Sequence, residues 1–126
     1  MILVDTSVWI DHLRVGEAAL ASLLNNGQVL AHPFVTGELA CGNLANRASF
    51  LMLLGDLPQA SVATLDEVLF FIEQNGLMGK GIGYIDAHLL AATALEAPAR
   101  FWTRDKRLAR VAMGLNLEFE FIQVSD

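Results

Sequence analysis

The chain has 126 residues, a net charge of −6, and 54% hydrophobic residues against 17% charged ones. This length fits one domain with a proper core, and no apolar run approaches the roughly 20 residues of a membrane-spanning helix. The acidic balance excludes a protein that is held to nucleic acid by overall charge alone. Cys41 is the only cysteine, so an internal disulfide is excluded, and we expect it to be a small buried apolar residue. Nothing in the sequence indicates export, and we expect a cytoplasmic protein.

Apolar spacing and turn residues predict that strands and helices alternate along the chain. We expect strands at residues 2–5, 28–31, 60–63, 100–103 and 118–124. We expect helices at residues 7–14, 17–26, 33–46, 48–54, 64–74, 84–97 and 105–113. This alternation predicts an α/β fold in which a parallel sheet carries helices on both faces.

Two acidic residues stand where predicted strands end. Asp5 closes the first apolar strand, and Asp105 follows the strand at 100–103 in the same arrangement. Ligands of open α/β sheets bind outside the carboxyl ends of the strands, so both carboxylates lie where chemistry is usually done. Either residue alone is equally explained as the N-cap of the next helix.

Two further acids stand on helix faces that are otherwise apolar. Glu38 has Phe34, Val35 and Cys41 as its helical neighbours, and Asp86 leads a stripe of apolar residues. The alternatives are an exposed Glu38 at a helix edge and an Asp86 that is stabilised by the helix N-terminus. We expect both helix faces to point towards the sheet.

Together the four acids predict one cluster, because a right-handed α/β fold can bring these positions to one crevice. Clustered carboxylates repel one another, and a hard divalent cation such as Mg²⁺ or Mn²⁺ removes this conflict. Such a cation lowers the pKa of a bound water and stabilises charge on a phosphoryl oxygen. The three histidines are scattered, and the sequence contains no zinc spacing and no P-loop.

Four parts of the sequence, taken together, resemble the PIN-domain family. They are the opening ILVDTSVWID (2–11), Glu38, the run GYIDAHLLAATA (83–94) and the segment WTRDKR (102–107). The short length and the opening DTSVWID are similar to the VapC toxins of VapBC toxin–antitoxin modules. The resemblance covers essentially the whole chain. It implies a single PIN-like domain over residues 1–126, a Rossmann-like three-layer sandwich with a central parallel sheet between helices.

The resemblance further implies a toxic endoribonuclease that depends on Mg²⁺, with Mn²⁺ as a substitute, and hydrolyses RNA phosphodiester bonds with a metal-activated water. Asp5 and Asp86 would be the core metal ligands, and Asp105 would complete the site directly or through water. Glu38 would orient the attacking water or bind a second metal.

The family pattern also implies supporting residues and partners. Thr6 and Thr103 would supply hydroxyls behind the ligating acids. A cognate VapB antitoxin is implied, together with a homodimer or a toxin–antitoxin hetero-oligomer that does not involve a membrane. The apolar composition independently leaves room for a partner helix in a groove.

Half of the eight basic residues stand in one stretch, namely Arg104, Lys106, Arg107 and Arg110. This stretch lies beside Asp105 and is suited to hold an RNA backbone next to the metal. The alternative is a solvated helix face whose cations favour the C-terminal end of the helix.

Two other functions compete with the nuclease. A non-catalytic PIN-like module would only bind an antitoxin or RNA, and the complete set of four acids argues against it. An aspartyl-phosphate hydrolase usually has a second Asp two residues after the first, and here that position is Ser7. The sequence does not indicate which RNA is the substrate.

Overall fold

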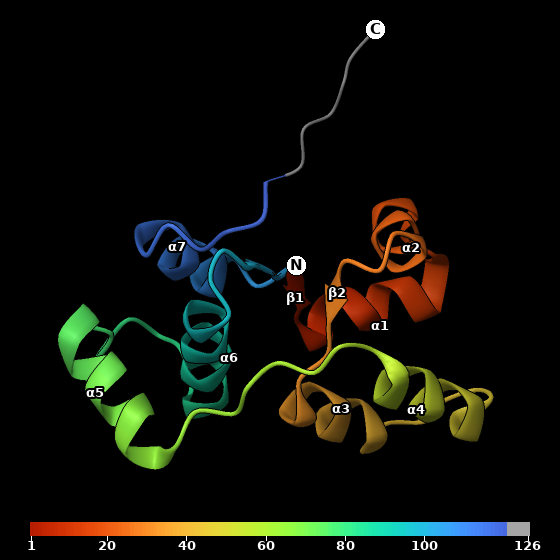
Figure 1. Cartoon of the computed structure of the whole chain (residues 1–126), viewed down its shortest axis with the longest axis horizontal. Helices are drawn as coiled ribbons and strands as arrows, with labels where there is room; N and C mark the ends of the chain where they lie inside the picture. The colour runs from red at the N-terminus through yellow and green to blue at the C-terminus, as the bar shows by residue number, and fades with distance from the viewer. Residues whose placement is uncertain (121–126) are drawn as a thin grey trace, which may run out of the picture.

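The computed structural model describes residues 1–120, and its sheet contains three short parallel strands in the order β2-β1-β3. The strands are β1 (Ile2–Val4), β2 (Val29–Leu30) and β3 (Arg100–Trp102). The helices are α1 (Thr6–Val15), α2 (Ala18–Asn25), α3 (Pro33–Ala40), α4 (Arg47–Asp56), α5 (Leu65–Asn75), α6 (Tyr84–Leu95) and α7 (Lys106–Gly114). Figure 1 shows the strands in the middle of the molecule, with α5, α6 and α7 to one side and α1 to α4 to the other.

The order of the strands positions the site. Helices α1 and α2 connect β1 to β2, whereas the chain from β2 returns through α3 to α6 and enters the sheet on the other side of β1. The connections therefore diverge on the two sides of β1, and in open α/β sheets ligands bind at such a point, outside the carboxyl ends of the strands. The predicted α/β fold with a central parallel sheet is confirmed.

The core lies where the sheet meets α1, α6 and α7. Leu3, Trp9, Phe101 and Leu108 are almost completely buried. Helix α6 is the most enclosed helix, since every residue from 87 to 93 is buried. A helix that is apolar on all sides belongs inside a protein, which explains the run of Ala and Leu in this segment. The buried scaffold holds the first turn of α6 at a fixed place beside the sheet.

The helix predicted at 33–46 is too long, because α3 ends at Ala40. Arg47 donates from its guanidinium to the carbonyl oxygens of Ala40 and Gly42, at 2.6 and 3.2 Å. These bonds satisfy carbonyl groups near the end of α3 and favour a loop up to Asn46, whose φ of 51° is left-handed. Cys41 follows the helix and is exposed, so the expectation of a buried cysteine is wrong.

One predicted strand is absent, and another lies only partly within the described residues. Residues 60–63 form no strand, and an isolated parallel bridge pairs Ala31 with Gln59 just before this segment. The strand expected at 118–124 begins with a bridge between Phe101 and Glu118, and its residues 121–124 lie outside the described part of the chain. Within residues 1–120, the helices are all too short or too polar to cross a membrane.

Candidate active site

Asp5 is the buried centre of the candidate site, with a relative exposure of 7%. It follows β1 directly, and its backbone N–H donates to the carbonyl oxygen of Trp102 at 2.9 Å, which extends the pairing of β1 and β3. Asp5 occupies the N-cap position of α1, yet its side chain makes no capping hydrogen bond. The explanation of Asp5 as a simple helix cap therefore fails, because its carboxylate is used elsewhere.

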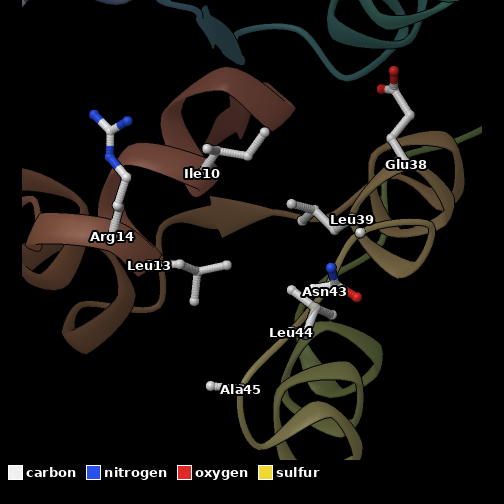
Figure 2. A pocket seen from close by; sticks show the side chains of 9 residues that line it. Ile10, Leu13, Arg14, Glu38, Leu39, Asn43, Leu44 and Ala45 are labelled. Carbon is white, nitrogen blue, oxygen red and sulfur yellow. The ribbon is translucent and has the colours of Figure 1, made fainter.

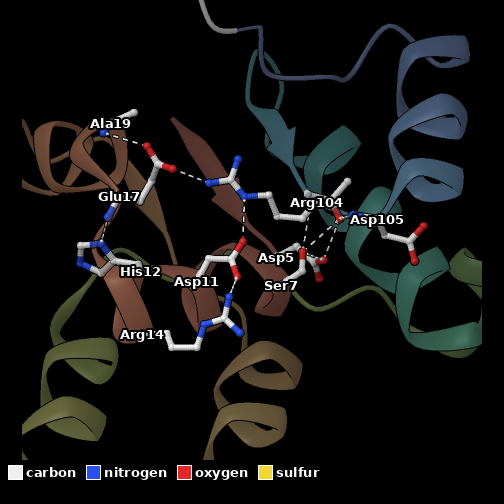
Figure 3. Close-up of polar contacts among 10 residues, drawn as sticks. Asp5, Ser7, Asp11, His12, Arg14, Glu17, Ala19, Arg104 and Asp105 are labelled. Atoms are coloured by element: carbon white, nitrogen blue, oxygen red, sulfur yellow. Dashed lines mark hydrogen bonds and ion pairs between the residues drawn. The ribbon is translucent and has the colours of Figure 1, made fainter.

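The Asp5 carboxylate is instead held by two hydroxyls (Figure 3). Ser7 Oγ and Thr103 Oγ1 both donate to Oδ2 of Asp5, at 2.7 and 2.8 Å. Each hydroxyl in turn accepts a backbone N–H, from Arg104 for Ser7 and from Asp105 for Thr103, both at 3.0 Å. These N–H groups fix the orientations of the two hydroxyls, so the hydroxyl protons point to Asp5. The other carboxylate oxygen, Oδ1, stays outside these bonds.

Glu38 lies near the carboxyl end of β1, but its side chain is not oriented as expected. It is exposed on α3 rather than turned towards the sheet, and its Oε1 accepts a hydrogen bond from Thr6 Oγ1 at 2.9 Å. Because Thr6 directly follows Asp5, this bond ties Glu38 to the start of α1. The hydroxyl of Thr6 thus supports Glu38, whereas that of Thr103 supports Asp5.

Asp86 lies in the first turn of α6, and Asp105 is the N-cap residue of α7. Asp86 Oδ2 accepts from the backbone N–H of Gly83 at 3.2 Å, and Asp105 Oδ1 accepts from those of Arg107 and Leu108 at 2.9 and 3.1 Å. The capping roles considered for these two acids are therefore both present. They use one oxygen of each carboxylate and leave the second oxygen free of these bonds.

The electrostatics of Asp86 indicate that the acids face one another. Burial away from water raises the pKa of Asp86 above its usual value, and the negative charges of Asp5 and Asp105 raise it further. The hydrogen bond from Gly83 acts in the opposite direction. In the described residues, neither these three acids nor Glu38 forms an ion pair with a basic side chain. The site therefore carries negative charge that the protein itself does not neutralise.

This donor set fits a hard divalent cation that retains waters. Within residues 1–120, no three His, Cys, Asp or Glu side chains are grouped closely enough to hold a metal ion, so the acids do not form a protein cage for one. Mg²⁺ does not require such a cage, because it usually keeps several waters and takes one or two carboxylates from the protein. Carboxylate oxygens without a cationic partner are the ligands that it prefers.

The basic stretch divides into two parts. Arg104 Nε pairs with Asp11 at 3.2 Å, its terminal nitrogen pairs with Glu17, and its guanidinium lies over Trp102 at 5.5 Å from the ring centre. This arginine is therefore engaged within the protein, as Figure 3 shows. Arg107 and Arg110 instead line a cleft between α7 and the end of α5, and Lys106 is exposed outside this lining.

Two residues were missing from the sequence-based site. Ser7 was considered only as the position that lacks a second Asp, yet its hydroxyl donates to Asp5 at 2.7 Å. Lys80, in the loop after α5, lines the same cleft as Arg107 and Arg110. Its neighbourhood depends on how the loop folds onto α7, which no local pattern reveals.

The histidines play no part in this cluster. His32 and His88 are buried, and the ring of Phe34 contacts both, with centroids 5.0 and 4.9 Å away. Burial lowers the pKa of His32 to about 4, and the proximity of His88 contributes. They are neutral packing residues at ordinary pH.

Comparison with known proteins identifies the class of this fold and site. Residues 2–113 match the PIN domain family, which is nearly the whole described chain. The chain therefore belongs to the PIN-domain family.

Individual relatives narrow the comparison from the family to one kind of PIN-domain protein. Ribonuclease VapC32 of Mycobacterium tuberculosis (strain ATCC 25618 / H37Rv) is 51% identical over 108 residues, which cover 86% of this chain and 87% of the relative. Ribonuclease VapC32 of strain CDC 1551 / Oshkosh matches with the same values. The predicted resemblance to VapC-type proteins is thus confirmed.

Proposed function

We propose that this protein is the toxin of a type II toxin–antitoxin system, an endoribonuclease that depends on Mg²⁺ and hydrolyses RNA phosphodiester bonds. The observation that carries the proposal is the environment of Asp5. Its buried carboxylate is held in place by two oriented hydroxyls and stands near Asp86 and Asp105 without a basic partner. The relationship to proteins named ribonucleases supports the same reaction.

Asp5 and Asp86 are the proposed principal ligands of the metal, and Asp105 completes the set directly or through water. When bound, Mg²⁺ or Mn²⁺ supplies a lower pKa for water and stabilises the negative charge that develops on the phosphate. The pKa of Asp86, raised by burial and by its acidic neighbours, supports this assignment, because a cation relieves the repulsion.

The remaining residues of the site position Asp5 and activate the attacking water. Ser7 and Thr103 hold Asp5 in one orientation through Oδ2 and leave Oδ1 for ligand binding. Glu38 is exposed and held by Thr6, so its carboxylate is able to accept a proton from the attacking water or to bind a second metal. The protein thus supplies orientation, and negative charge for the cation, beyond the carboxyl ends of β1 and β3.

Cleavage of total cellular RNA by the purified, antitoxin-free protein tests this proposal. Reactions contain Mg²⁺, Mn²⁺ or EDTA, and Asp5→Asn serves as the matched variant. We expect discrete fragments that require metal and are absent with Asp5→Asn. Cleavage that persists in Asp5→Asn contradicts the site. Absence of cleavage by folded wild-type protein favours a module that only binds an antitoxin or RNA.

The proposed partner is a cognate VapB-type antitoxin. The surface of this protein to which it would dock is an apolar groove of about 430 Å³. Figure 2 shows Ile10 and Leu13 of α1 facing Leu39 of α3 across this groove. Arg14 and Glu38 also line it. Because Glu38 belongs both to the groove and to the acidic edge, a helix bound here would reach the catalytic crevice, which supports inhibition by occupation.

Co-expression with the cognate antitoxin tests the groove. Leu13 is exposed, so Leu13→Glu leaves the fold intact while it places a charge against the apolar face of the partner. We expect loss of antitoxin co-purification with retained metal-dependent cleavage. Unchanged co-purification would exclude the groove as the docking surface.

We also propose a homodimer or toxin–antitoxin hetero-oligomer that acts in the cytoplasm, where cellular RNA is present. Support for assembly comes from large apolar side chains that are exposed on and after α5, namely Leu65, Leu69, Phe70 and Met78. Light scattering of the purified protein, alone and with antitoxin, measures the mass. A monomer in both samples contradicts this part of the proposal.

A further inference from the structure

A cleft of about 400 Å³ separates α7 from the end of α5 and the loop that follows it. Lys80, Arg107 and Arg110 supply its charged lining, and Leu77, Val111 and Leu115 supply apolar lining. We call this feature the basic cleft. All three cations are exposed, so their charged ends are available to a ligand.

The charges of the basic cleft are not neutralised by the protein. Among residues 1–120, the ion pairs are those that Arg14 and Arg104 make with Asp11 and Glu17, and none involves the cations of the cleft. The chain as a whole has a net charge of −6. Three neighbouring cations without acidic partners therefore create a local positive field on an acidic protein, and such a field attracts an anionic ligand.

The loop orients Arg107 through a close backbone contact. Gly81 has a φ of +80°, and a Cβ added there would lie 3.0 Å from Cδ and 3.1 Å from Nη1 of Arg107. Only glycine adopts this conformation easily and leaves this space. Arg107 and Arg110 are three residues apart on α7, so they share one face of the helix.

Both walls of the basic cleft lead directly to the acids of the active site. The backbone N–H of Arg107 donates to Asp105 at 2.9 Å, at the start of α7. The loop that carries Lys80 ends at Gly83, whose N–H donates to Asp86 at 3.2 Å. A polymer bound in the cleft therefore continues naturally towards the carboxylates.

We propose that the basic cleft binds the phosphodiester backbone of single-stranded RNA, at nucleotides that flank the bond to be cleaved. This inference rests on the proposed ribonuclease function. Phosphate oxygens match the guanidinium groups of Arg107 and Arg110 and the ammonium group of Lys80. Three cations in one small cleft suit a few nucleotides of a single strand, whereas a double-stranded RNA module spans about 16 base pairs.

Fluorescence anisotropy with a short, labelled single-stranded oligoribonucleotide of mixed sequence tests the proposal. The buffer contains EDTA, so binding is measured without cleavage. We expect Lys80→Gln, Arg107→Gln and Arg110→Gln each to weaken binding by about fivefold and to reduce the slope of log affinity against log salt by about 0.7. Lys106→Gln is the matched comparison, because it removes one charge from α7 outside the cleft lining, and we expect a smaller loss.

A Gly81→Ala variant tests the orientation of Arg107. We expect it to weaken RNA binding in the wild-type background and to have no further effect in Arg107→Gln, as a double-mutant cycle would report. Equal losses in both backgrounds would show that Gly81 acts only on the loop and would overturn its role in positioning Arg107.

The outcomes separate the cleft from the proposed function. If wild-type protein cleaves RNA while the three cleft variants bind no more weakly than Lys106→Gln, the cleft assignment is wrong and the nuclease stands. If wild-type protein binds RNA through these cations yet never cleaves it with Mg²⁺ or Mn²⁺, the nuclease fails and the cleft stands. Failure of wild-type protein to bind the oligoribonucleotide overturns the cleft directly.

Discussion

Two sets of carboxylates lie near the carboxyl ends of β1 and β3, and they differ in their partners. Asp11 and Glu17 are paired with the guanidinium of Arg104, and Asp11 also pairs with Arg14. Asp5 and Asp86 make no such pair and accept hydrogen bonds from hydroxyls and from a backbone N–H. The first set is neutralised by the protein itself, and the second set keeps its charge.

This difference separates a structural role from a functional one. A carboxylate that already has an arginine partner joins segments of the fold, here α1, α2 and the end of β3. Carboxylates that are partly buried and repel one another destabilise the metal-free protein, and such an arrangement is typical of a site that awaits a cation. We infer that the absence of a basic partner, rather than the presence of an acid, marks the catalytic group.

The largest expected effect contrasts Asp5→Asn with Asp11→Asn. The first change removes the charge of a proposed metal ligand but keeps an oxygen for Ser7 and Thr103, and we expect RNA cleavage to fall by about 1000-fold. The second change removes the same charge from the Arg104 cluster and should leave cleavage within about twofold, in line with a weak exposed pair. Initial cleavage rates measure both. Similar losses in the two variants would remove the distinction between the two sets.

The hydroxyls behind Asp5 should have an intermediate effect. Thr103→Val keeps the shape of the side chain and removes the hydrogen bond of 2.8 Å to Asp5. Loss of a group that orients a metal ligand typically lowers metal affinity or activity by about 10- to 100-fold. We expect a higher metal concentration for half-maximal cleavage, with rescue by Thr103→Ser. A variant with normal metal dependence would show that the hydroxyl serves only the fold.

Removal of the arginine from the neutralised set should have a modest effect. Arg104→Gln breaks contacts with Asp11 and Glu17 that are only partly shielded from water. We expect the free energy of unfolding to fall by less than about 1 kcal/mol, with a smaller difference at high salt. Urea denaturation at low and high ionic strength measures this change. A much larger loss would mean that the cluster is a principal support of the fold.

The smallest expected effect is on the stability of the metal-free protein and on its dependence on pH. The pKa of Asp86 is raised by burial and by Asp5 and Asp105, so the folded state binds this proton more tightly than the unfolded state. The charged Asp86 therefore lowers the free energy of unfolding. This loss of stability is complete above the raised pKa, decreases as the pH falls through it, and is absent below the ordinary pKa of Asp, about 3.9. In EDTA, Asp86→Asn should therefore be more stable than wild type at neutral pH, and this advantage should shrink in acid.

Urea denaturation of both proteins across this pH range tests the shift. Asn keeps an oxygen that accepts the hydrogen bond from Gly83, so the comparison isolates the charge. If Asp86→Asn is less stable than wild type at neutral pH in EDTA, the carboxylate is not under repulsion.

The sequence predicted the fold well where patterns are local and strong. The helix predicted at 64–74 forms as α5, which Thr64 and Glu67 begin with a capping box, and the helix predicted at 84–97 forms as the buried helix α6. The end of α3 was missed because it depends on Arg47, which reaches back from the next helix to carbonyl groups of residues 40 and 42. Such contacts between elements leave no periodic signal.

The candidate site was predicted in its residues more than in its contacts. Asp5 and Asp105 followed from their places after strands, since parallel strands bring their carboxyl ends to one edge. The apolar neighbours of Glu38 suggested an inward side chain, but α3 presents it to solvent beside Thr6. The division of the basic residues between an ion-paired Arg104 and the basic cleft was not predictable, because it depends on side-chain partners that are distant in the sequence.

The most direct test of the central claim is the thermal unfolding of wild type, Asp5→Asn and Asp11→Asn, each in EDTA and in millimolar Mg²⁺ or Mn²⁺. A metal present at 100 times its dissociation constant stabilises the folded state by about 2.7 kcal/mol. We predict a metal-induced rise in melting temperature for wild type and Asp11→Asn, and a much smaller rise for Asp5→Asn. No rise in wild type, or the same rise in all three proteins, would contradict a metal site built on the unneutralised carboxylates.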